Sequence, residues 1–426
     1  MSKRLLWRRA ATAVGTYGSV ALGVLATLLA ARKLGPGPFG VFSQAVVAAN
    51  FFQTLLDLTV EEAMIKFGYR YQTARRWGRL RRLYRRGLAL KSVGGLVAAA
   101  VVLVLAPFAD SIFGTKHLVT PMLIAALLPV ALIPESLSGA VFVLAGRYDI
   151  RGWFLALSQG LRFAGIVAGA QFGVTEAILG LVLGQAAASL CVGGAALAVF
   201  RRLPASPPEP LGEDRPEIVR FVVQSSIATG MVSLRGSIVP LLLGVVTTDK
   251  QVGYFRAAQA PQTGLAALSS PIRLIMLTEQ TRDWEAGSRD TVFAGIRRFS
   301  IGAAVLMAVT VPPVYVFMPD LVRVFLGRDF VPASDAARLI LLAGAIQLVI
   351  AWTKSFPVSI GRPGLRILTH GIETLVVIPL ALVFGDHWGA TGAAAAILIA
   401  TCAFTAVWLA ALVQIRRSPL PSPAAG

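Results

Sequence analysis

Long apolar stretches recur along almost the whole chain, and this feature limits its fold more than any other. A transmembrane helix needs about 20 predominantly apolar residues to cross the hydrocarbon core of a bilayer. Only 14% of the residues are charged, which is too few for the surface of a soluble protein. We therefore predict an all-α polytopic membrane protein with about 12 transmembrane helices. The apolar windows lie near residues 12–31, 39–60, 88–106, 119–145, 153–172, 175–199, 218–246, 253–278, 299–318, 334–356, 366–384 and 389–413.

The basic residues predict the orientation of these helices. The chain has 40 Lys and Arg against 21 Asp and Glu, a net charge of +19. If the N-terminus is cytoplasmic, 28 of the 40 fall on the cytoplasmic side and 6 on the opposite side. Because Lys and Arg are retained in the cytoplasm, we expect a multi-pass protein of the cell (cytoplasmic) membrane with both termini inside. Most of the charge is then a topology signal, so we expect no nucleic-acid partner.

A proline-rich segment divides the chain almost in half. Five prolines and several charges lie between Leu203 and Pro216, a composition that can neither cross a bilayer nor pack as a helix. We predict an N-terminal six-helix lobe over 1–203, a cytoplasmic linker over 204–216, a C-terminal six-helix lobe over 217–415 and a cytoplasmic tail over 416–426.

The two halves share sequence landmarks in the same order. Gly40 opens the second window and Gly253 the eighth, an offset of 213 residues. Six spans separate the halves, so both have the same orientation, as in a parallel repeat related by an axis along the membrane normal. The repeat favours two parallel six-helix lobes around a central cavity, although glycine and arginine also end many unrelated spans. The other paired landmarks, at offsets of 212 and 215, are Phe113 with Phe325 and Gly146 with Gly361.

The segment after the first span resembles a known family signature. Residues 32–43, Arg-Lys-Leu-Gly-Pro-Gly-Pro-Phe-Gly-Val-Phe-Ser, are similar to the "LGP-x-x-FG-x-Y" signature of Wzx-type polysaccharide flippases in the multidrug/oligosaccharidyl-lipid/polysaccharide (MOP) superfamily. Residues 241–258 are similar to that family's junction between spans seven and eight. The resemblance implies a transporter and not an enzyme. Its expected activity is alternating-access flipping of a polyprenyl-pyrophosphate-linked oligosaccharide for surface polysaccharide biosynthesis.

Six basic residues remain within or at the edge of the predicted spans, where a charge at the membrane centre costs roughly 2.5–3.5 kcal/mol on insertion scales. A cavity with more cations than anions favours an anionic passenger, and guanidinium groups bind phosphate oxygens in bidentate geometry. In the alternative interpretation each cation pairs with a carboxylate, as Arg162 could with Glu135, and takes no part in transport. The candidate substrate-binding cations are Arg162, Arg235, Arg256, Arg273 and Lys354.

Four carboxylates near membrane depth are candidates for ion coupling or for pairing with these cations: Asp57, Glu61, Glu135 and Glu373. Relatives often carry an acidic residue in the seventh span, where this chain has Leu234-Arg235-Gly236-Ser237. The coupling ion, Na⁺ or H⁺, is therefore open. We expect no other cofactor, no metal site and no catalytic residues, because the sequence lacks a nucleophile–base set and a GxxxxGK[ST] loop.

The densest basic run, residues 70–86, carries apolar residues at nearly helical spacing. We predict one amphipathic helix on the cytoplasmic surface, with Tyr71, Trp77, Leu80 and Tyr84 on its apolar face. Anionic membrane lipids attract such a segment by about 1 kcal/mol per charge. The helix would either anchor the protein or recruit its lipid-linked substrate.

Two other functions are weighed against a flippase. A multidrug exporter of the same superfamily needs acidic residues for cationic drugs, and residues 10–31 contain none. A membrane-embedded glycan polymerase or ligase needs long outer loops, and the longest, near 319–333, holds few charged groups. Lipid II as the passenger is a variant of the first function. We expect a monomer, and a contact with polysaccharide polymerase machinery is open, as is the sugar.

Overall fold

The computed structural model describes the backbone of residues 3–56, 58–115, 117–360, 362 and 364–417. These residues form helices and short turns and contain no strand. The chain divides into two compact units, which we describe separately. The first unit comprises Met1–Ala260 with Pro319–Ser334, and the second comprises Pro261–Met318 with Asp335–Gly426.

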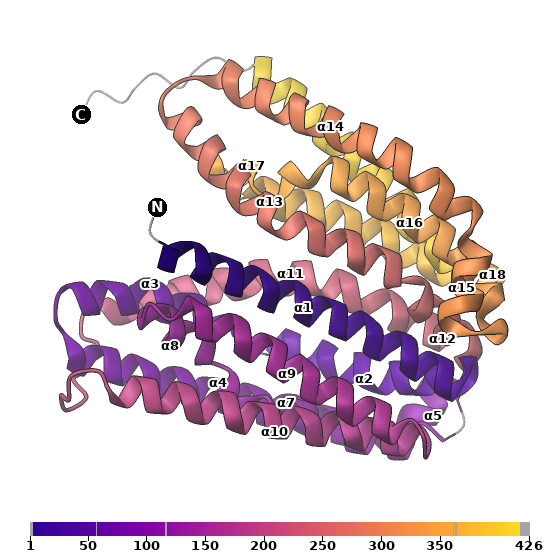
Figure 1. Ribbon diagram of the computed structural model, residues 1–426, viewed down its shortest axis with the longest axis horizontal. Helices are drawn as coiled ribbons and strands as arrows, with labels where there is room; N and C mark the ends of the chain where they lie inside the picture. Colours follow the sequence, from indigo (N-terminus) through magenta and orange to yellow (C-terminus); the bar gives the residue numbers. More distant parts are fainter. Residues whose placement is uncertain (1–2, 57, 116, 361, 363, 418–426) are drawn as a thin grey trace. The chain divides into compact units, whose positions relative to one another are not determined.

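The described residues of the first unit form fourteen helices or short 3₁₀ segments before residue 261 and two after residue 317 (Figure 1). They are α1 (Lys3–Leu34), α2 (Pro36–Leu56), α3 (Val60–Thr73), α4 (Trp77–Leu105), η1 (Ala106–Phe108), α5 (Ala109–Ile112), α6 (Val119–Ala125), α7 (Leu128–Ala131), η2 (Ile133–Glu135), α8 (Ser138–Leu144), α9 (Tyr148–Gly169), α10 (Val174–Arg201), α11 (Asp214–Val246), α12 (Asp249–Ala258), α15 (Met318–Leu326) and η3 (Arg328–Ala333).

The second unit is built from long helices and one short broken segment. They are α13 (Ala260–Glu285), α14 (Arg289–Val316), α16 (Ser334–Val349), η4 (Ala351–Lys354), α17 (Phe356–Ser359) and α18 (Gly364–Arg417). Aromatic side chains form its core: Trp352 packs edge-on against both Phe356 and Trp408, and all three are buried.

Every apolar window coincides with a helix or a broken run of helices, which confirms the all-α polytopic membrane fold. The fourth window is divided into α6, α7, η2 and α8, since Pro129 and Pro134 cannot donate backbone hydrogen bonds. The last two windows lie in α18, which kinks at Gly389 with a φ of 56°. Within the described residues, eight helical stretches are long and apolar enough to cross a membrane. Helix α9, with Arg162 in its middle, is not among them.

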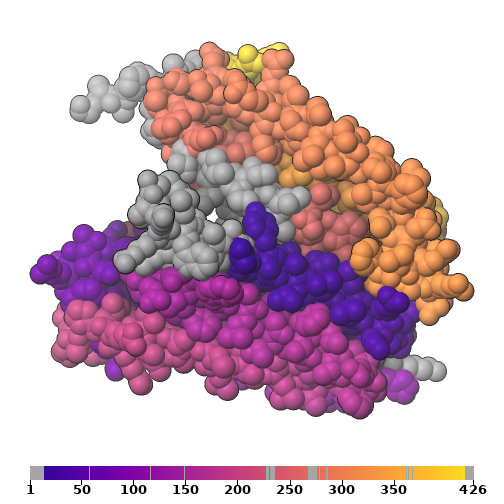
Figure 2. All heavy atoms as spheres, viewed as in Figure 1, coloured from indigo at the N-terminus to yellow at the C-terminus, as the bar shows by residue number. Residues whose placement is uncertain are grey.

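Helices α9 and α10 form a hairpin that packs through glycine. A Cβ atom on Gly165 would overlap the backbone of Gly180, and the reverse also holds. Small residues allow such close backbone approach between membrane helices. The hairpin and α1 cover one face of the first unit (Figure 2), and the close approach sets the register of α9 against α10.

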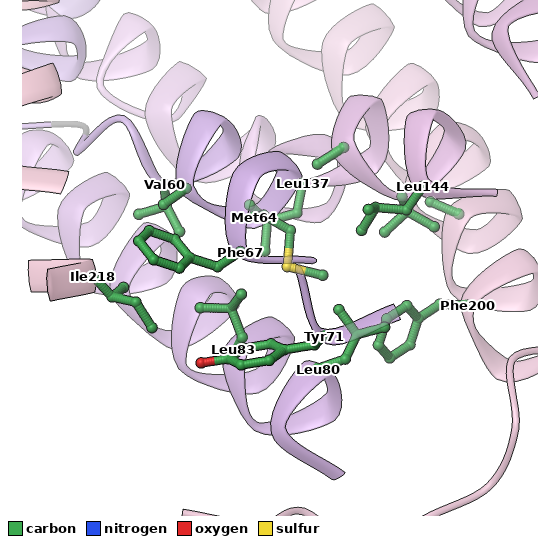
Figure 3. Close-up of a cluster of buried hydrophobic side chains, with 14 of the residues drawn as sticks. Val60, Met64, Phe67, Tyr71, Leu80, Leu83, Leu137, Leu144, Phe200 and Ile218 are labelled. Atoms are coloured by element: carbon green, nitrogen blue, oxygen red, sulfur yellow. The ribbon is translucent and has the colours of Figure 1, made fainter. Parts of the chain in front are cut away.

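The apolar face of α3 is buried in protein rather than in lipid. Met64, Phe67 and Tyr71 are fully buried in a cluster with Leu80 of α4 and side chains of α8, α10 and α11 (Figure 3). The single surface helix predicted over residues 70–86 is therefore wrong. The chain turns between α3 and α4 at Arg75, which has a φ of +53°.

The proline-rich linker lies against the start of α4. Arg81 Nη2 donates to the carbonyl oxygens of Leu203 at 3.0 Å and Pro204 at 3.2 Å, and Glu209 N–H donates to the Gly78 carbonyl at 3.2 Å. Leu211 is buried in the same cluster as Tyr71. The linker is thus held along its length.

Two glycines that the repeat aligns also meet in the fold. A Cβ atom on Gly40 of α2 would overlap the Asp249 carbonyl of α12, and one on Gly253 of α12 would overlap the Pro36 carbonyl of α2. We call this contact the glycine crossing. Gly114 and Gly327, also aligned by the repeat, both have positive φ, 59° and 100°. The shared local geometry supports the internal repeat, while the division into two moving lobes stays a prediction.

Candidate functional site

The first unit brings together two of the residues singled out in the sequence. Arg162 Nη2 of α9 lies 3.6 Å from Glu135 Oε1 of η2, and their side chains are 28% and 16% exposed. Gln185 Nε2 of α10 donates to the same carboxylate oxygen at 3.0 Å, and Ser158 Oγ donates to Oε2 at 3.4 Å. Gln185 also donates to Ser189 Oγ at 2.6 Å. These residues form a polar cluster among apolar helices.

Breaks and glycines in the helices position this cluster. Pro134 interrupts the fourth window, so Glu135 sits in a short 3₁₀ segment. Gly193 of α10 lets that segment approach, because a Cβ atom there would overlap the Pro134 carbonyl. Gly184 likewise contacts the backbone of α9 at Leu161 and Arg162. The backbone approach of both segments to α10 brings Arg162 and Glu135 together.

The guanidinium of Arg162 is only partly used by this pairing. A distance of 3.6 Å makes an ion pair but exceeds hydrogen-bond length, and Arg162 Nε is buried with no hydrogen-bond partner among the described residues. A guanidinium has five N–H donors, and a buried donor without a partner costs about 1–3 kcal/mol. The structure thus contains the Arg162–Glu135 pair that one of the two interpretations predicted. Arg162 still has N–H donors that an incoming anion could use.

Arg256 is the second basic residue of interest in the first unit. Its Nη1 donates to Gln259 Oε1 at 2.6 Å on the same face of α12, and its buried Nε has no hydrogen-bond partner within the described part of the chain. No described carboxylate lies within ion-pair distance of Arg256. It therefore keeps a net positive charge locally, unlike Arg162.

Glu61 joins a different contact. Its Oε1 lies 3.9 Å from Arg151 Nη2 of α9, and both side chains are more than a third exposed. The neighbouring Glu62 accepts a hydrogen bond from Ser225 of α11. Thus Glu61 does not share a site with Glu135, and the two carboxylates contact different cations.

The second unit buries an acid beside a histidine. Glu373 of α18 is completely buried, and its Oε2 lies 3.2 Å from His370 Nδ1, one helical turn earlier. The His370 ring stacks on Phe404, with 5.1 Å between ring centroids. Sequence reasoning found Glu373 but missed His370, although the spacing of three residues on a helix indicates a contact.

The remaining candidates are less defined. Lys354 is half-buried in η4 of the second unit. Asp57 and the side chains of Arg235 and Arg273 lie outside the described residues, so their predicted roles stay predictions.

Sequence reasoning also missed a chain of amides in the second unit. Gln262 Nε2 of α13 donates to Gln347 Oε1 of α16 at 3.1 Å, and Gln347 Nε2 donates to Thr401 Oγ1 of α18 at 3.2 Å. Gln347 is the single glutamine of its apolar window, residues 334–356. An isolated glutamine at membrane depth needs a partner and is the signal that could have found this chain. Among the described residues no group of three His, Cys, Asp or Glu could hold a metal ion.

Comparisons with known proteins place these features in a family and a fold. A protein family described as "Polysaccharide biosynthesis protein" matches residues 9–273. No curated protein matches the chain significantly. Identities near 13% show a shared fold with three solved structures and no more. The first is an inward-facing multidrug resistance MATE family transporter of the MOP superfamily, with 14% identity and a TM-score of 0.72 over 97% of this chain and 99% of the other. The second is the lipid II flippase MurJ in an inward closed conformation, with 13% identity and a TM-score of 0.73 over 94% of this chain and 87% of the other. The third is a MOP superfamily transporter from Pyrococcus furiosus whose binding pocket is described as having reverse polarity, with 12% identity and a TM-score of 0.62 over 98% of this chain and 100% of the other.

Proposed function

The chain belongs to the polysaccharide biosynthesis protein family, and from this premise we propose that it is a flippase for a polyprenyl-pyrophosphate-linked oligosaccharide. The passenger would move from the cytoplasmic to the outer leaflet of the cell membrane during surface polysaccharide biosynthesis. The family match over residues 9–273 is the observation that carries this proposal. The fold shared with the lipid II flippase MurJ supports it, since lipid II is also a lipid-linked glycan.

The passenger's pyrophosphate explains why arginine lies at membrane depth. Arg162 has guanidinium donors that Glu135 leaves unused, and Arg256 has no described carboxylate partner. In a low-dielectric site, a phosphate oxygen that takes these donors gains more than it would in water. Glu135 keeps Arg162 in place between passengers, and Gln185 holds Glu135. Arg235, Arg273 and Lys354 remain further candidates for the same role.

The transport cycle proposed here is alternating access by two six-helix lobes, with the lipid tail left in the bilayer. The glycine crossing between α2 and α12 is the contact within the first unit that would separate in one half of the cycle. Glu373 is the carboxylate that we propose for ion coupling, because it is buried and lies 3.2 Å from a second group that takes up protons, His370. Whether the ion is H⁺ or Na⁺ is decided by which gradient drives transport.

Glycan export in cells tests this function. Removing the protein should trap the lipid-linked glycan in the inner leaflet, and the wild-type chain should restore export. Arg162→Ala and Arg256→Ala should each lower export at least tenfold while the protein stays in the membrane. Arg201→Ala, an exposed basic residue at the end of α10, is the matched control and should export normally. Full export by both variants would show that Arg162 and Arg256 do not bind the passenger.

A multidrug exporter is the alternative, because a MATE family transporter shares the fold. This alternative predicts a cationic passenger, whereas the flippase carries an anionic one. Expression of the chain would then raise resistance to cationic drugs and leave the lipid-linked glycan unaffected, an outcome that would replace the flippase.

A further inference from the structure

A groove on the second unit lies outside the polar clusters described above. It has a volume of about 960 Å³ and is lined by α14, the α16–η4 segment and the C-terminal part of α18. This volume is at the upper end of the range for small-molecule pockets, about 300–1,000 Å³. Its walls come from elements of one unit only.

Part of the groove lining is cationic. Arg297 and Arg298 of α14 and Arg416 in the last turn of α18 line the groove, with Asp290 as the carboxylate beside them. All three arginines are exposed, and none makes an ion pair with a carboxylate in the described part of the chain. The groove lining therefore carries a net positive charge and several free guanidinium donors.

The other lining residues are mostly apolar. Ile301 of α14 and Leu409 and Val413 of α18 line the groove and are each about half exposed, at 53%, 52% and 50%. Its floor is formed by buried or half-buried apolar side chains, namely Phe293, Val349, Ile350 and Trp352. A ligand that covers this surface has an apolar body longer than its head group, and its head group is anionic.

The position of the arginines along the helices distinguishes two kinds of anionic lipid. Arg297 and Arg298 directly precede the ninth apolar window, and Arg416 follows the twelfth. They therefore lie at the membrane–water interface, where the phosphate of a glycerophospholipid rests, and on the side that the charge pattern predicts to be cytoplasmic. A pyrophosphate that crosses the membrane needs cationic partners at membrane depth, where Arg162 lies.

We propose that the groove between α14 and α18 is a binding site for an anionic glycerophospholipid of the inner leaflet. Arg297, Arg298 and Arg416 bind its phosphate, and its acyl chains cover Ile301, Leu409 and Val413. Basic pockets between membrane helices on the cytoplasmic side recognise acidic lipid head groups in this way. The site does not depend on what the protein transports.

Lipid retention and thermal unfolding of the purified full-length chain test the site. Two changes target it: the triple variant Arg297→Gln, Arg298→Gln, Arg416→Gln removes the charge, and Ala294→Phe on α14 fills the groove without changing charge. Two controls are matched to them. Arg201→Gln, Arg215→Gln, Arg220→Gln removes three exposed charges from the first unit, and Ala308→Phe adds the same bulk on an exposed part of α14 away from the groove.

Mass spectrometry of the detergent-purified protein should find an acidic glycerophospholipid at about one per chain in wild type and both controls. The triple variant and Ala294→Phe should retain at least fivefold less. Phosphatidylglycerol added to delipidated protein should raise the melting temperature of wild type, and phosphatidylcholine should not.

Equal retention in wild type and the triple variant would overturn the site, as would stabilisation by phosphatidylcholine alone. Retention of a polyprenyl phosphate in place of a phospholipid would assign the groove to the passenger and overturn the proposed occupant. A flippase that transports normally after losing the lipid would leave this proposal intact, so the two proposals can fail separately.

Discussion

Among the contacts that join the helices before the linker to those after it in the first unit, two have opposite chemistry. At the α5 end, α2 and α12 meet at Gly40 and Gly253 with backbone against backbone. At the α3 end, α3 and α4 hold the linker and the start of α11 through charged side chains, including Arg79 Nη1 to Asp214 Oδ2 at 2.8 Å and Arg70 to Glu217 at 2.7 Å. We call the second contact the ionic contact.

The two contacts differ in how much change of geometry each one tolerates. A backbone crossing has no room for even one added methyl group, so it is either closed or fully separated. Surface ion pairs are adjustable and are screened by salt. We infer that the glycine crossing is the discrete step of a transport cycle, and that the ionic contact keeps α11 attached to the first unit throughout.

The largest effect is expected at the glycine crossing. Gly40→Ala puts a methyl group on the Asp249 carbonyl, and overpacking of this kind costs about 1–3 kcal/mol. Thermal unfolding in detergent should show a lower melting temperature, and export should fall. Gly37→Ala on the same helix is the matched control, since no atom lies within 4 Å of its Cβ position. Equal behaviour of the two variants would contradict a tight crossing.

A smaller loss is expected at the buried part of the ionic contact. Asp214 accepts hydrogen bonds from Arg79 at 2.8 Å and from the Tyr71 hydroxyl at 3.0 Å. Hydrogen bonds to a charged acceptor contribute about 1.5–3 kcal/mol and those to a neutral acceptor about 0.5–1.5 kcal/mol. Asparagine keeps a neutral acceptor oxygen, so Asp214→Asn should lower the unfolding free energy by about 1 kcal/mol. Asp283→Asn is the control, because Asp283 is equally exposed at 21% and pairs only with its neighbour Arg282. A loss no greater than that of Asp283→Asn would show that the linker is not held there.

Next in size is a pH effect at the glycine crossing. Burial raises the pKa of Asp249, Asp110 raises it further, and the hydrogen bond from Thr115 lowers it. The folded state thus takes up this proton at a higher pH than the unfolded state, so stability rises as pH falls through the folded-state pKa towards the unfolded value. Asp249→Asn should flatten this part of the stability curve measured between pH 3 and pH 7. Asp329→Asn, exposed in the same unit, should leave it unchanged.

The smallest effect is expected at the exposed part of the ionic contact. The hydrogen bond from Arg70 lowers the pKa of Glu217, so its contribution is present at neutral pH and is lost as pH falls through that lowered value. Glu217→Gln should lower the melting temperature slightly at low ionic strength. In 0.5 M salt the difference from wild type should vanish, because the Debye length falls to a few ångströms. A difference that persists in high salt would mean that the pair acts through packing.

The helices could be predicted from the sequence because membrane helices depend on local hydrophobicity. Pro134 and Gly389 sit at the breaks that their backbone chemistry favours. The turn at Arg75 could not be predicted, because arginine seldom adopts positive φ and only the packing of α3 against α4 requires it. The repeat gave the alignment of Gly40 with Gly253, but not that the two would meet.

The candidate site was predictable in part. Depth in the membrane singled out Arg162 and Glu135 as a possible pair, which they are. The groups around them are the hydroxyl of Ser158, one turn from Arg162 on α9, and the amide of Gln185 on α10, and only the packing of these helices against η2 brings them to one carboxylate. The contact of Glu373 with His370 was missed although their helical spacing indicates it, and the stacking of His370 on Phe404 was not visible in the pattern.

Direct measurement of flipping tests the central claim. The purified chain is reconstituted into vesicles with a labelled polyprenyl-pyrophosphate oligosaccharide, and a glycan-cleaving enzyme added outside reports the passenger that reaches the outer leaflet. We expect wild-type vesicles to expose the inner pool at least tenfold faster than vesicles with Arg162→Ala, and protein-free vesicles to expose none. Equal exposure with and without the protein, under H⁺ and Na⁺ gradients alike, would contradict the flippase.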